Sequence, residues 1–189
     1  MRIRTVLALS TAATALLLAV PQTGTAAPQT GSAAPRSAQA PTQPAKAAAQ
    51  PAKCAQNVLK LRAEQSADPT VVHISVTNRS ARACTVDRIP TVTFGDLDGA
   101  ALPTPAGESG PYRIGAGRTV YAAVRTIVDP ADPEARRVDS ITVSADPARY
   151  GRSFTARELG AGDAVLVWEP VTTWWKPSVA AADKALGLS

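Results

Sequence analysis

The sequence is poor in residues that bind metals, with one histidine and two cysteines among 189 residues. A structural zinc site needs four Cys or His ligands, and His73, Cys54 and Cys84 do not reach that number. No cofactor or metal is therefore expected. Aromatic residues are also scarce, at 4% of the chain, so any local concentration of them stands out.

The chain also lacks a hydrophobic run long enough to cross a membrane. Its most apolar stretch, residues 6–20, is shorter than the roughly 18 residues of a membrane span. It follows Arg2 and Arg4 and precedes small residues, which is the layout of a secretory signal peptide. We expect a signal peptide over residues 1–26, cleaved after Ala26, and no stable membrane span after cleavage. An uncleaved anchor is the alternative.

The next segment, residues 27–53, has no aromatic residue and no Leu, Ile or Val. It consists largely of Ala, Pro and Gln. Such a segment has nothing to bury against the cost of ordering a backbone, about 1–2 kcal/mol per residue. We expect a disordered linker between the signal peptide and a folded domain.

The two cysteines have one possible pairing. Exported proteins keep disulfides, whereas cytosolic proteins rarely do. The signal peptide therefore predicts a bond between Cys54 and Cys84. A loop of this size should stabilise the fold by roughly 3–4 kcal/mol.

The net charge of +5 does not belong to the domain. Residues 54–189 contain fifteen Lys and Arg and all fifteen Asp and Glu, so their net charge is zero. Nucleic-acid binding through the phosphate backbone needs a concentrated basic face. The local clusters, Arg136 with Arg137 and Arg149 with Arg152, are interleaved with Asp and Glu. Nucleic acid is not expected as a partner.

Residues 54–170 show the alternation of apolar and polar residues that is typical of β-strands. The expected strands are 57–63, 70–78, 91–94, 118–128, 139–145 and 163–169. Asp98-Gly99 reads as a hairpin turn. Short strands between Gly, Pro and Asp clusters predict an all-β fold, an antiparallel two-sheet β-sandwich of immunoglobulin-like size. A C-terminal tail, residues 171–189, includes a short helix that Ser178 can cap.

The order of several residues resembles a known family. These residues are Cys54, Thr77-Asn78-Arg79-Ser80, Cys84-Thr85-Val86, Pro90, strand 91–94, Asp98-Gly99 and Gly117. The order is similar to that of an actinobacterial family of exported proteins, the domain of unknown function 4232 family. The resemblance is strongest over residues 54–128. It implies an immunoglobulin-like β-sandwich on the outer side of the membrane, and it supplies no activity.

One segment resembles a catalytic motif. The sequence GESGP around Ser109 is similar to the nucleophile motif of chymotrypsin-like proteases, and His73 and Asp96 or Asp98 precede it in that family's order. Pro111 replaces the second glycine, and the segment between His73 and Ser109 is too short for a double barrel. We expect no enzyme. Asp96 and Asp98 alone do not make a calcium loop.

All three tryptophans lie close together: Trp168, Trp174 and Trp175. Trp168 ends an apolar strand, and we expect it in the core. Neighbouring residues of an extended segment face opposite ways, so one ring of the Trp174-Trp175 pair is expected at the surface. Exposed Trp often contacts partners, so we expect Trp174 and Trp175 to mark a binding surface that residues 168–176 border. The alternative is that both rings cover a sheet face or edge.

These observations favour a secreted, extracellular protein. Association with the cell wall is one location open to such a protein. The expected function is that of a non-catalytic exported domain that binds a cell-envelope component or another exported protein. Two alternatives stay open: a secreted hydrolase and a passive structural spacer.

Overall fold

The computed structural model describes residues 51–188. The expected signal peptide, residues 1–26, and linker residues 27–50 lie outside this range. The last residues of the expected linker take part in the fold. The amide of Thr85 donates to the carbonyl of Ala52 at 3.0 Å, and the amide of Cys54 donates to the carbonyl of Thr85 at 2.8 Å.

The described chain consists mainly of short strands. The first half contains η1 (Gln56–Val58), β1 (Leu59–Gln65), β2 (Val71–Asn78), β3 (Cys84–Asp87), β4 (Thr91–Phe94), β5 (Leu102–Thr104) and β6 (Pro111–Ile114). The second half contains β7 (Thr119–Arg125), β8 (Arg136–Val138), β9 (Ser140–Ser144), β10 (Arg152–Thr155), α1 (Ala156–Leu159), β11 (Val165–Val167), β12 (Val171–Thr173) and α2 (Val179–Leu186).

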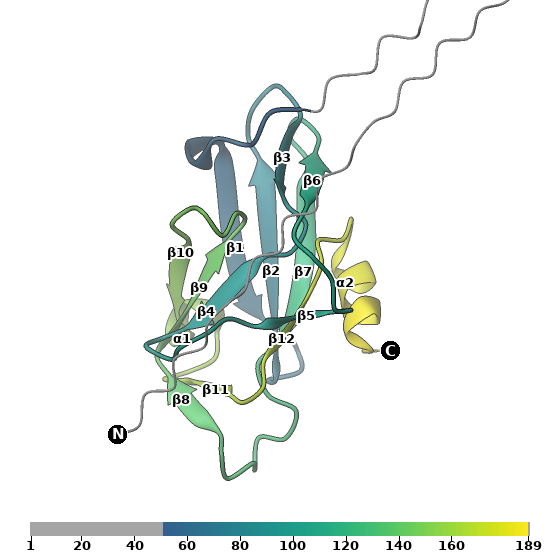
Figure 1. Cartoon of the computed structure of the whole chain (residues 1–189). Coiled ribbons are helices and arrows are strands. Elements are labelled where there is room, and N and C mark those ends of the chain that lie inside the picture. Colours follow the sequence, from purple (N-terminus) through teal and green to yellow (C-terminus); the bar gives the residue numbers. More distant parts are fainter. Residues whose placement is uncertain (1–50, 189) are drawn as a thin grey trace, which may run out of the picture. The chain divides into compact units, whose positions relative to one another are not determined.

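One large sheet and three small ones make up the fold (Figure 1). The large sheet has the strand order β1-β2-β7-β12-β5, and the small sheets are β10-β9-β4, β11-β8 and β3-β6. Neighbouring strands are antiparallel except for β12 and β5, which run parallel. The predicted mostly β, antiparallel fold is confirmed, with this one parallel pair. The immunoglobulin-like comparison stays a prediction.

The core lies between the inner face of the large sheet and the small sheets. On β2, Val72, Ile74 and Val76 are buried, as their alternation predicts. Opposite them lie buried residues of the small sheets, such as Val92 of β4 and Ile141 of β9. Burying such side chains contributes roughly 1.5–3 kcal/mol each, so this face supplies much of the stability.

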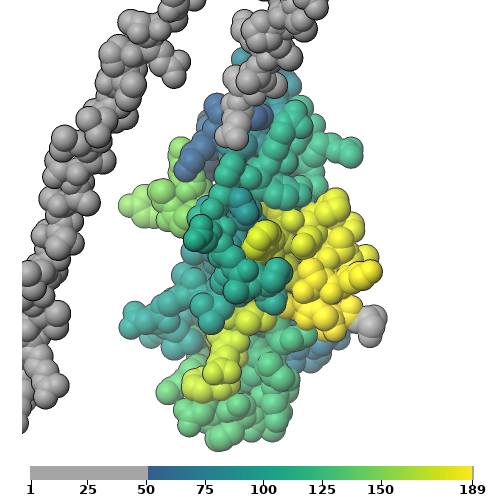
Figure 2. Space-filling view, turned by 45° about the vertical axis from the view of Figure 1, so that its right-hand side comes forward, coloured from purple at the N-terminus to yellow at the C-terminus, as the bar shows by residue number. Residues whose placement is uncertain are grey.

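The outer face of the large sheet is partly covered by α2. Ala182 and Leu186 of α2 pack on Val71 and Ala123 of the sheet, and all four are buried. This cover explains why β7 is buried on both faces and does not alternate as a half-exposed strand would. The space-filling view shows α2 and the preceding chain, in yellow, against the teal surface of the middle of the chain (Figure 2).

The predicted C-terminal helix is present, and Ser178 caps it. Its hydroxyl accepts a hydrogen bond from the amide of Ala181 at 3.2 Å. His73 of β2 fastens the helix, because its Nε2 lies 2.7 Å from Oδ1 of Asp183. Residues 171–188 are therefore not a separate tail: β12 pairs within the large sheet and α2 packs on it.

The predicted hairpin at Asp98-Gly99 is wrong. The chain reverses there, but β4 pairs with β9 while β5 pairs with β12. A single backbone bond, from the amide of Ala101 to the carbonyl of Val92, joins the two sides. The turn signal was local, whereas the partner of each strand is decided by distant residues.

Candidate functional site

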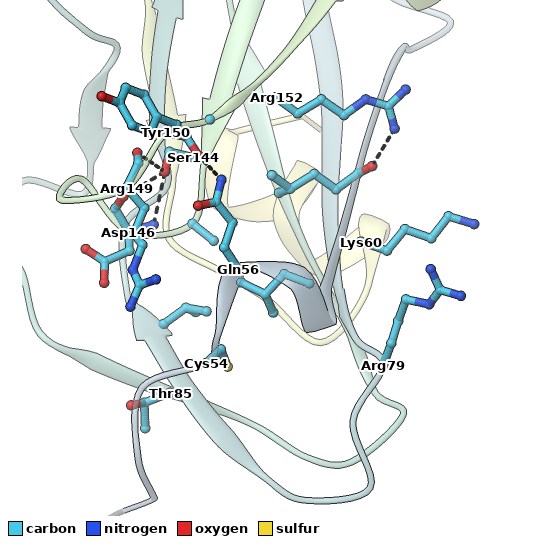
Figure 3. Close-up of a pocket in the computed structure, with 15 residues that line it drawn as sticks. Cys54, Gln56, Lys60, Arg79, Thr85, Ser144, Asp146, Arg149, Tyr150 and Arg152 are labelled. Atoms are coloured by element: carbon cyan, nitrogen blue, oxygen red, sulfur yellow. Dashed lines mark hydrogen bonds between the residues drawn. The ribbon is translucent and has the colours of Figure 1, made fainter.

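A cleft of about 270 Å³ opens between the start of β1 and the loop of residues 145–151, which joins β9 to β10. Its lining includes four cationic side chains: Lys60, Arg79, Arg149 and Arg152. We call this cleft, with its four cations, the basic cleft. Figure 3 shows Lys60 and Arg79 projecting to one side of Gln56, with Arg149 on the other side.

The loop of the cleft is held by its own short-range bonds. The hydroxyl of Ser144 lies 2.7 Å from the carbonyl oxygen of Asp146, and Oδ1 of Asp146 accepts from the amide of Ala148 at 3.0 Å. Gly151 lets the loop approach β9 closely, since a Cβ at this position would lie 2.7 Å from the carbonyl oxygen of Val143. The backbone at Arg149 is held as well, because its carbonyl accepts from the hydroxyl of Ser144 at 3.1 Å.

Two contacts tie the loop to the segment before β1. The side-chain Nε2 of Gln56 donates to the backbone carbonyl of Tyr150 at 2.6 Å, and Nζ of Lys53 lies 3.1 Å from Oδ2 of Asp146. The disulfide between Cys54 and Cys84 is present, as predicted, and Cys54 lines the cleft. Residues from distant parts of the chain thus meet at the cleft, next to the disulfide bond between Cys54 and Cys84.

Asp146 is the one carboxylate among the residues that line the cleft. Partial burial raises its pKa, but the amide of Ala148 and the ammonium of Lys53 outweigh this effect and hold the pKa below its ordinary value. Asp146 is therefore ionised at neutral pH, and Lys53 balances its charge. Arg149 lies near enough to lower the pKa of Asp146 further, but it forms no ion pair with this carboxylate.

The cations differ in how firmly the fold holds them. Arg152 donates to the carbonyl of Leu61 at 3.2 Å and lies over the ring of Phe154 at 4.5 Å. Within residues 51–188, the side chains of Lys60, Arg79 and Arg149 form no ion pair and no hydrogen bond. Cations without partners are available for an anionic ligand, and guanidinium groups match carboxylate and phosphate geometry well.

Tyr150 adds an aromatic ring to the edge of the cleft. It is 92% exposed, which is unusual for a large side chain with an apolar body. Tyrosine combines an apolar face with a polar tip and is enriched at contact surfaces. An exposed ring beside free cations suits a ligand with both a sugar-like face and negative groups.

The tryptophan pair is divided between core and surface. Trp175 is only 2% exposed and belongs to the main core, so it cannot contact a partner in this conformation. Trp174 is partly exposed; its Nε1 donates to the carbonyl of Pro105 at 3.0 Å, and its ring lies against Gly107. A contact role for Trp174 stays a prediction. The structure places Trp168 outside the core, where it is partly exposed.

The residues of the protease-like motif have separate partners. The hydroxyl of Ser109 donates to Oδ2 of Asp87 at 2.7 Å, whereas His73 is bonded to Asp183 of α2. Asp96 and Asp98 lie exposed in the loop after β4. Over the described range, 51–188, no group of three or more His, Cys, Asp or Glu side chains is placed to hold a metal ion.

The basic cleft was not predicted from the sequence. Arg149 and Arg152 form only a local basic cluster there, and nothing in that cluster indicated a role for Tyr150 between them. Lys60 and Arg79 come from other segments, and only the pairing of β1 with β2 brings them to the same place. The run ARYGR, an aromatic residue between two arginines and beside a glycine, is the one signal that could have found the loop.

Comparison with known proteins adds a family and no activity. A family model described as Domain of unknown function (DUF4232) matches residues 54–175. No curated protein and no solved structure matches the chain. In the part of the chain that the structure describes, no helix has the length and apolar character to cross a membrane.

Proposed function

This chain belongs to the DUF4232 family of domains of unknown function, and we propose from its own surface that it is an exported, non-catalytic module that binds a negatively charged component of the cell envelope. The observation that carries this proposal is the basic cleft. Three of its cations, Lys60, Arg79 and Arg149, have no partner within residues 51–188, and the exposed ring of Tyr150 lies at its edge.

Export is supported by two independent features of the chain. The apolar segment at residues 6–20 with Arg2 and Arg4 before it has the layout of a signal peptide. The disulfide between Cys54 and Cys84 suits an oxidising compartment outside the cytosol. Envelope polymers that carry phosphate or carboxylate groups are anions of the kind that guanidinium groups bind well.

A binding role is favoured over a hydrolase by the environment of Ser109. A serine nucleophile needs a base within about 3 Å. The acceptor of the Ser109 hydroxyl is Asp87, and the single histidine of the chain is engaged by Asp183. Activity-based labelling of Ser109 in folded protein would overturn the non-catalytic part of the proposal.

The binding part is tested by co-sedimentation of the purified protein with isolated cell-wall material. We expect saturable pelleting that the double substitution Arg79→Gln with Arg149→Gln reduces strongly. The control is Arg136→Gln with Arg137→Gln, which removes the same charge from exposed positions of β8. Pelleting that both double variants reduce equally, or no pelleting at all, contradicts the proposal and directs the search to an exported protein partner.

A further inference from the structure

We infer that the ligand is an extended polymer with regularly repeated negative charges, which runs from the basic cleft around the edge strand β1 onto the outer face of the large sheet. This inference rests on the proposed function and adds the shape and charge pattern of the ligand. It starts from a second concave surface that borders the first.

This second surface is a groove of about 410 Å³ on the outer face of β1, β2 and β7. We call it the outer-face groove. Lys60 and Arg79 line both the basic cleft and the outer-face groove. The two concavities therefore adjoin at these side chains, and a ligand that spans both would contact Lys60 and Arg79.

The position of β1 makes this passage possible. β1 is the edge strand of the large sheet, so no further strand of this sheet lies beyond it (Figure 1). At this edge Arg152 donates to the carbonyl of Leu61, so it adds a cation to the path. Lys60 and Arg62 are exposed on the same face of β1. Side chains two positions apart on a strand are separated by about 7 Å, so they form a row of charges at a regular spacing. A repeating polymer matches such a row better than a small anion does.

The floor of the outer-face groove carries hydroxyl groups. Ser75 and Thr77 of β2 lie opposite Tyr121 and Thr119 of β7 in the register of the sheet. All four line the groove, and the hydroxyls of Thr77 and Thr119 lie 2.8 Å apart. Hydroxyls of this kind bind the oxygen atoms of a polar polymer, while the cations along β1 bind its charges.

Negative charges mark the far limit of the cationic stretch. Glu64 follows Arg62 on the exposed face of β1 and lies opposite His73 in the register of β1 and β2. His73 is in turn bonded to Asp183 of α2. The cationic path therefore extends from Arg149 in the loop to Arg62 on the sheet and ends there.

The test compares a long anion with a short one. Binding of long-chain polyphosphate and of tripolyphosphate to the purified protein is measured over a range of salt concentrations. We expect Arg62→Gln to weaken binding of the long chain about two- to fivefold, the effect of one exposed ionic contact, and to leave tripolyphosphate binding unchanged. The slope of log Kd against log salt should fall by about one for the long chain.

Four comparisons make the result decisive. Arg62→Lys keeps the charge and should keep the affinity, and Arg137→Gln, from the exposed face of β8, should leave both ligands unaffected. Arg149→Gln should weaken both the long and the short ligand. Poly-γ-glutamate distinguishes a carboxylate polymer from a phosphate polymer, and the dependence on Arg62 should hold for whichever of them binds.

The two proposals fail in different ways. If Arg62→Gln leaves long-chain binding unchanged while Arg149→Gln weakens it, the path around β1 is wrong and the basic cleft stands. If neither substitution weakens either ligand, the proposed function fails as well. A single-stranded oligonucleotide that binds as tightly as the envelope-like polymers would also overturn the inference, because the ligand class would then be nucleic acid.

Discussion

At the scale of single residues, Asn78 connects the end of β2 to two neighbouring segments. Its side chain is fully buried. Oδ1 accepts from the amide and the hydroxyl of Ser80 at 3.0 and 2.7 Å, and Nδ2 donates to the carbonyl of Arg82 at 2.7 Å. Nδ2 also lies 3.1 Å from the carbonyl of Gly115. Only an amide offers donors and acceptors together in this way.

We expect Asn78→Ala to lower the free energy of unfolding by about 2–3 kcal/mol, because several buried backbone groups lose their partner. Asn78→Asp should also destabilise the protein, since a carboxylate cannot donate to carbonyl groups. Urea unfolding monitored by circular dichroism measures both effects. The control is Asn57→Ala in η1, where the side chain is exposed. A midpoint for Asn78→Ala that equals the control value would contradict this account.

Two exposed carboxylates predict how stability depends on pH. The hydroxyl and amide of Thr70 lower the pKa of Asp68, and the amide and hydroxyl of Thr155 lower the pKa of Glu158. A carboxyl whose pKa is lower in the folded state stabilises the fold above its unfolded pKa of about 4. This contribution is lost as the pH falls through the folded pKa.

The melting temperature should therefore decline as the pH is lowered from about 5 to 3. Asp68→Asn should make the decline shallower, because this variant has one carboxylate fewer to protonate. Asp98→Asn, in the exposed loop after β4, is the matched control and should follow the unmodified protein. If the melting temperatures of Asp68→Asn and Asp98→Asn decline equally with pH, Asp68 does not contribute to the pH dependence of stability.

At the scale of elements, the disulfide fastens the segment before β1 to β3. The bond joins Cys54 to Cys84, thirty positions apart, and beside it Thr85 forms backbone hydrogen bonds with Ala52 and Cys54. Cys54 lines the basic cleft and Lys53 pairs with Asp146. The disulfide bond therefore also positions one wall of the cleft.

The double substitution Cys54→Ala with Cys84→Ala should lower the free energy of unfolding by roughly 3–4 kcal/mol, the entropy of closing a loop of this length. It should also weaken ligand binding at the basic cleft. Reduction of the unmodified protein serves as a matched comparison and should produce a similar loss of stability. If the double variant unfolds at the same denaturant concentration as the oxidised protein, the disulfide bond does not stabilise the fold.

The helix α2 forms one boundary of the outer-face groove, because Val179 lines it.

The packing of α2 on the sheet depends on Leu186. Leu186→Ala should lower the free energy of unfolding by about 2–4 kcal/mol, as expected for a buried leucine in contact with the sheet. Lys184→Ala, an exposed position of the same helix, is the control. Thermal unfolding measures the difference, and equal melting temperatures for the two variants would show that α2 does not depend on this contact.

At the scale of the whole domain, the charges are separated between its two ends. The loops at the end where β1 starts are residues 51–58, 79–83, 115–118 and 145–151 (Figure 1). They contain five cations, Lys53, Arg79, Arg82, Arg118 and Arg149, and one carboxylate, Asp146. The loops at the opposite end, residues 66–70, 95–101, 126–135 and 168–170, contain seven carboxylates and no cation. A domain whose charges sum to zero can therefore present a basic end to an anionic surface.

This separation predicts behaviour that net charge alone does not. Arg82→Gln with Arg118→Gln should lower the salt concentration that elutes the protein from a cation exchanger. Arg136→Gln with Arg137→Gln changes the net charge equally but lies close to the acidic end, and should have a smaller effect. Equal shifts for the two variants would show that net charge governs retention.

The sequence by itself determined the local features of this protein. Alternation along residues 70–78 predicted which side of β2 is buried, because successive side chains of a strand face opposite ways. Two cysteines allowed one disulfide, and Ser178 marked the start of α2. Each of these depends on a few neighbouring residues or on a simple count.

Only the tertiary structure decided which strands pair and which side chains meet. The parallel pair β5 and β12, the burial of Trp175 and the surface position of Trp168 all depend on distant partners. The basic cleft arises in the same way, because Lys60 and Arg149 are far apart in the chain and come together around one opening. Local periodicity indicates which face of a strand a residue lies on. The residues that it contacts on that face depend on how the whole core packs.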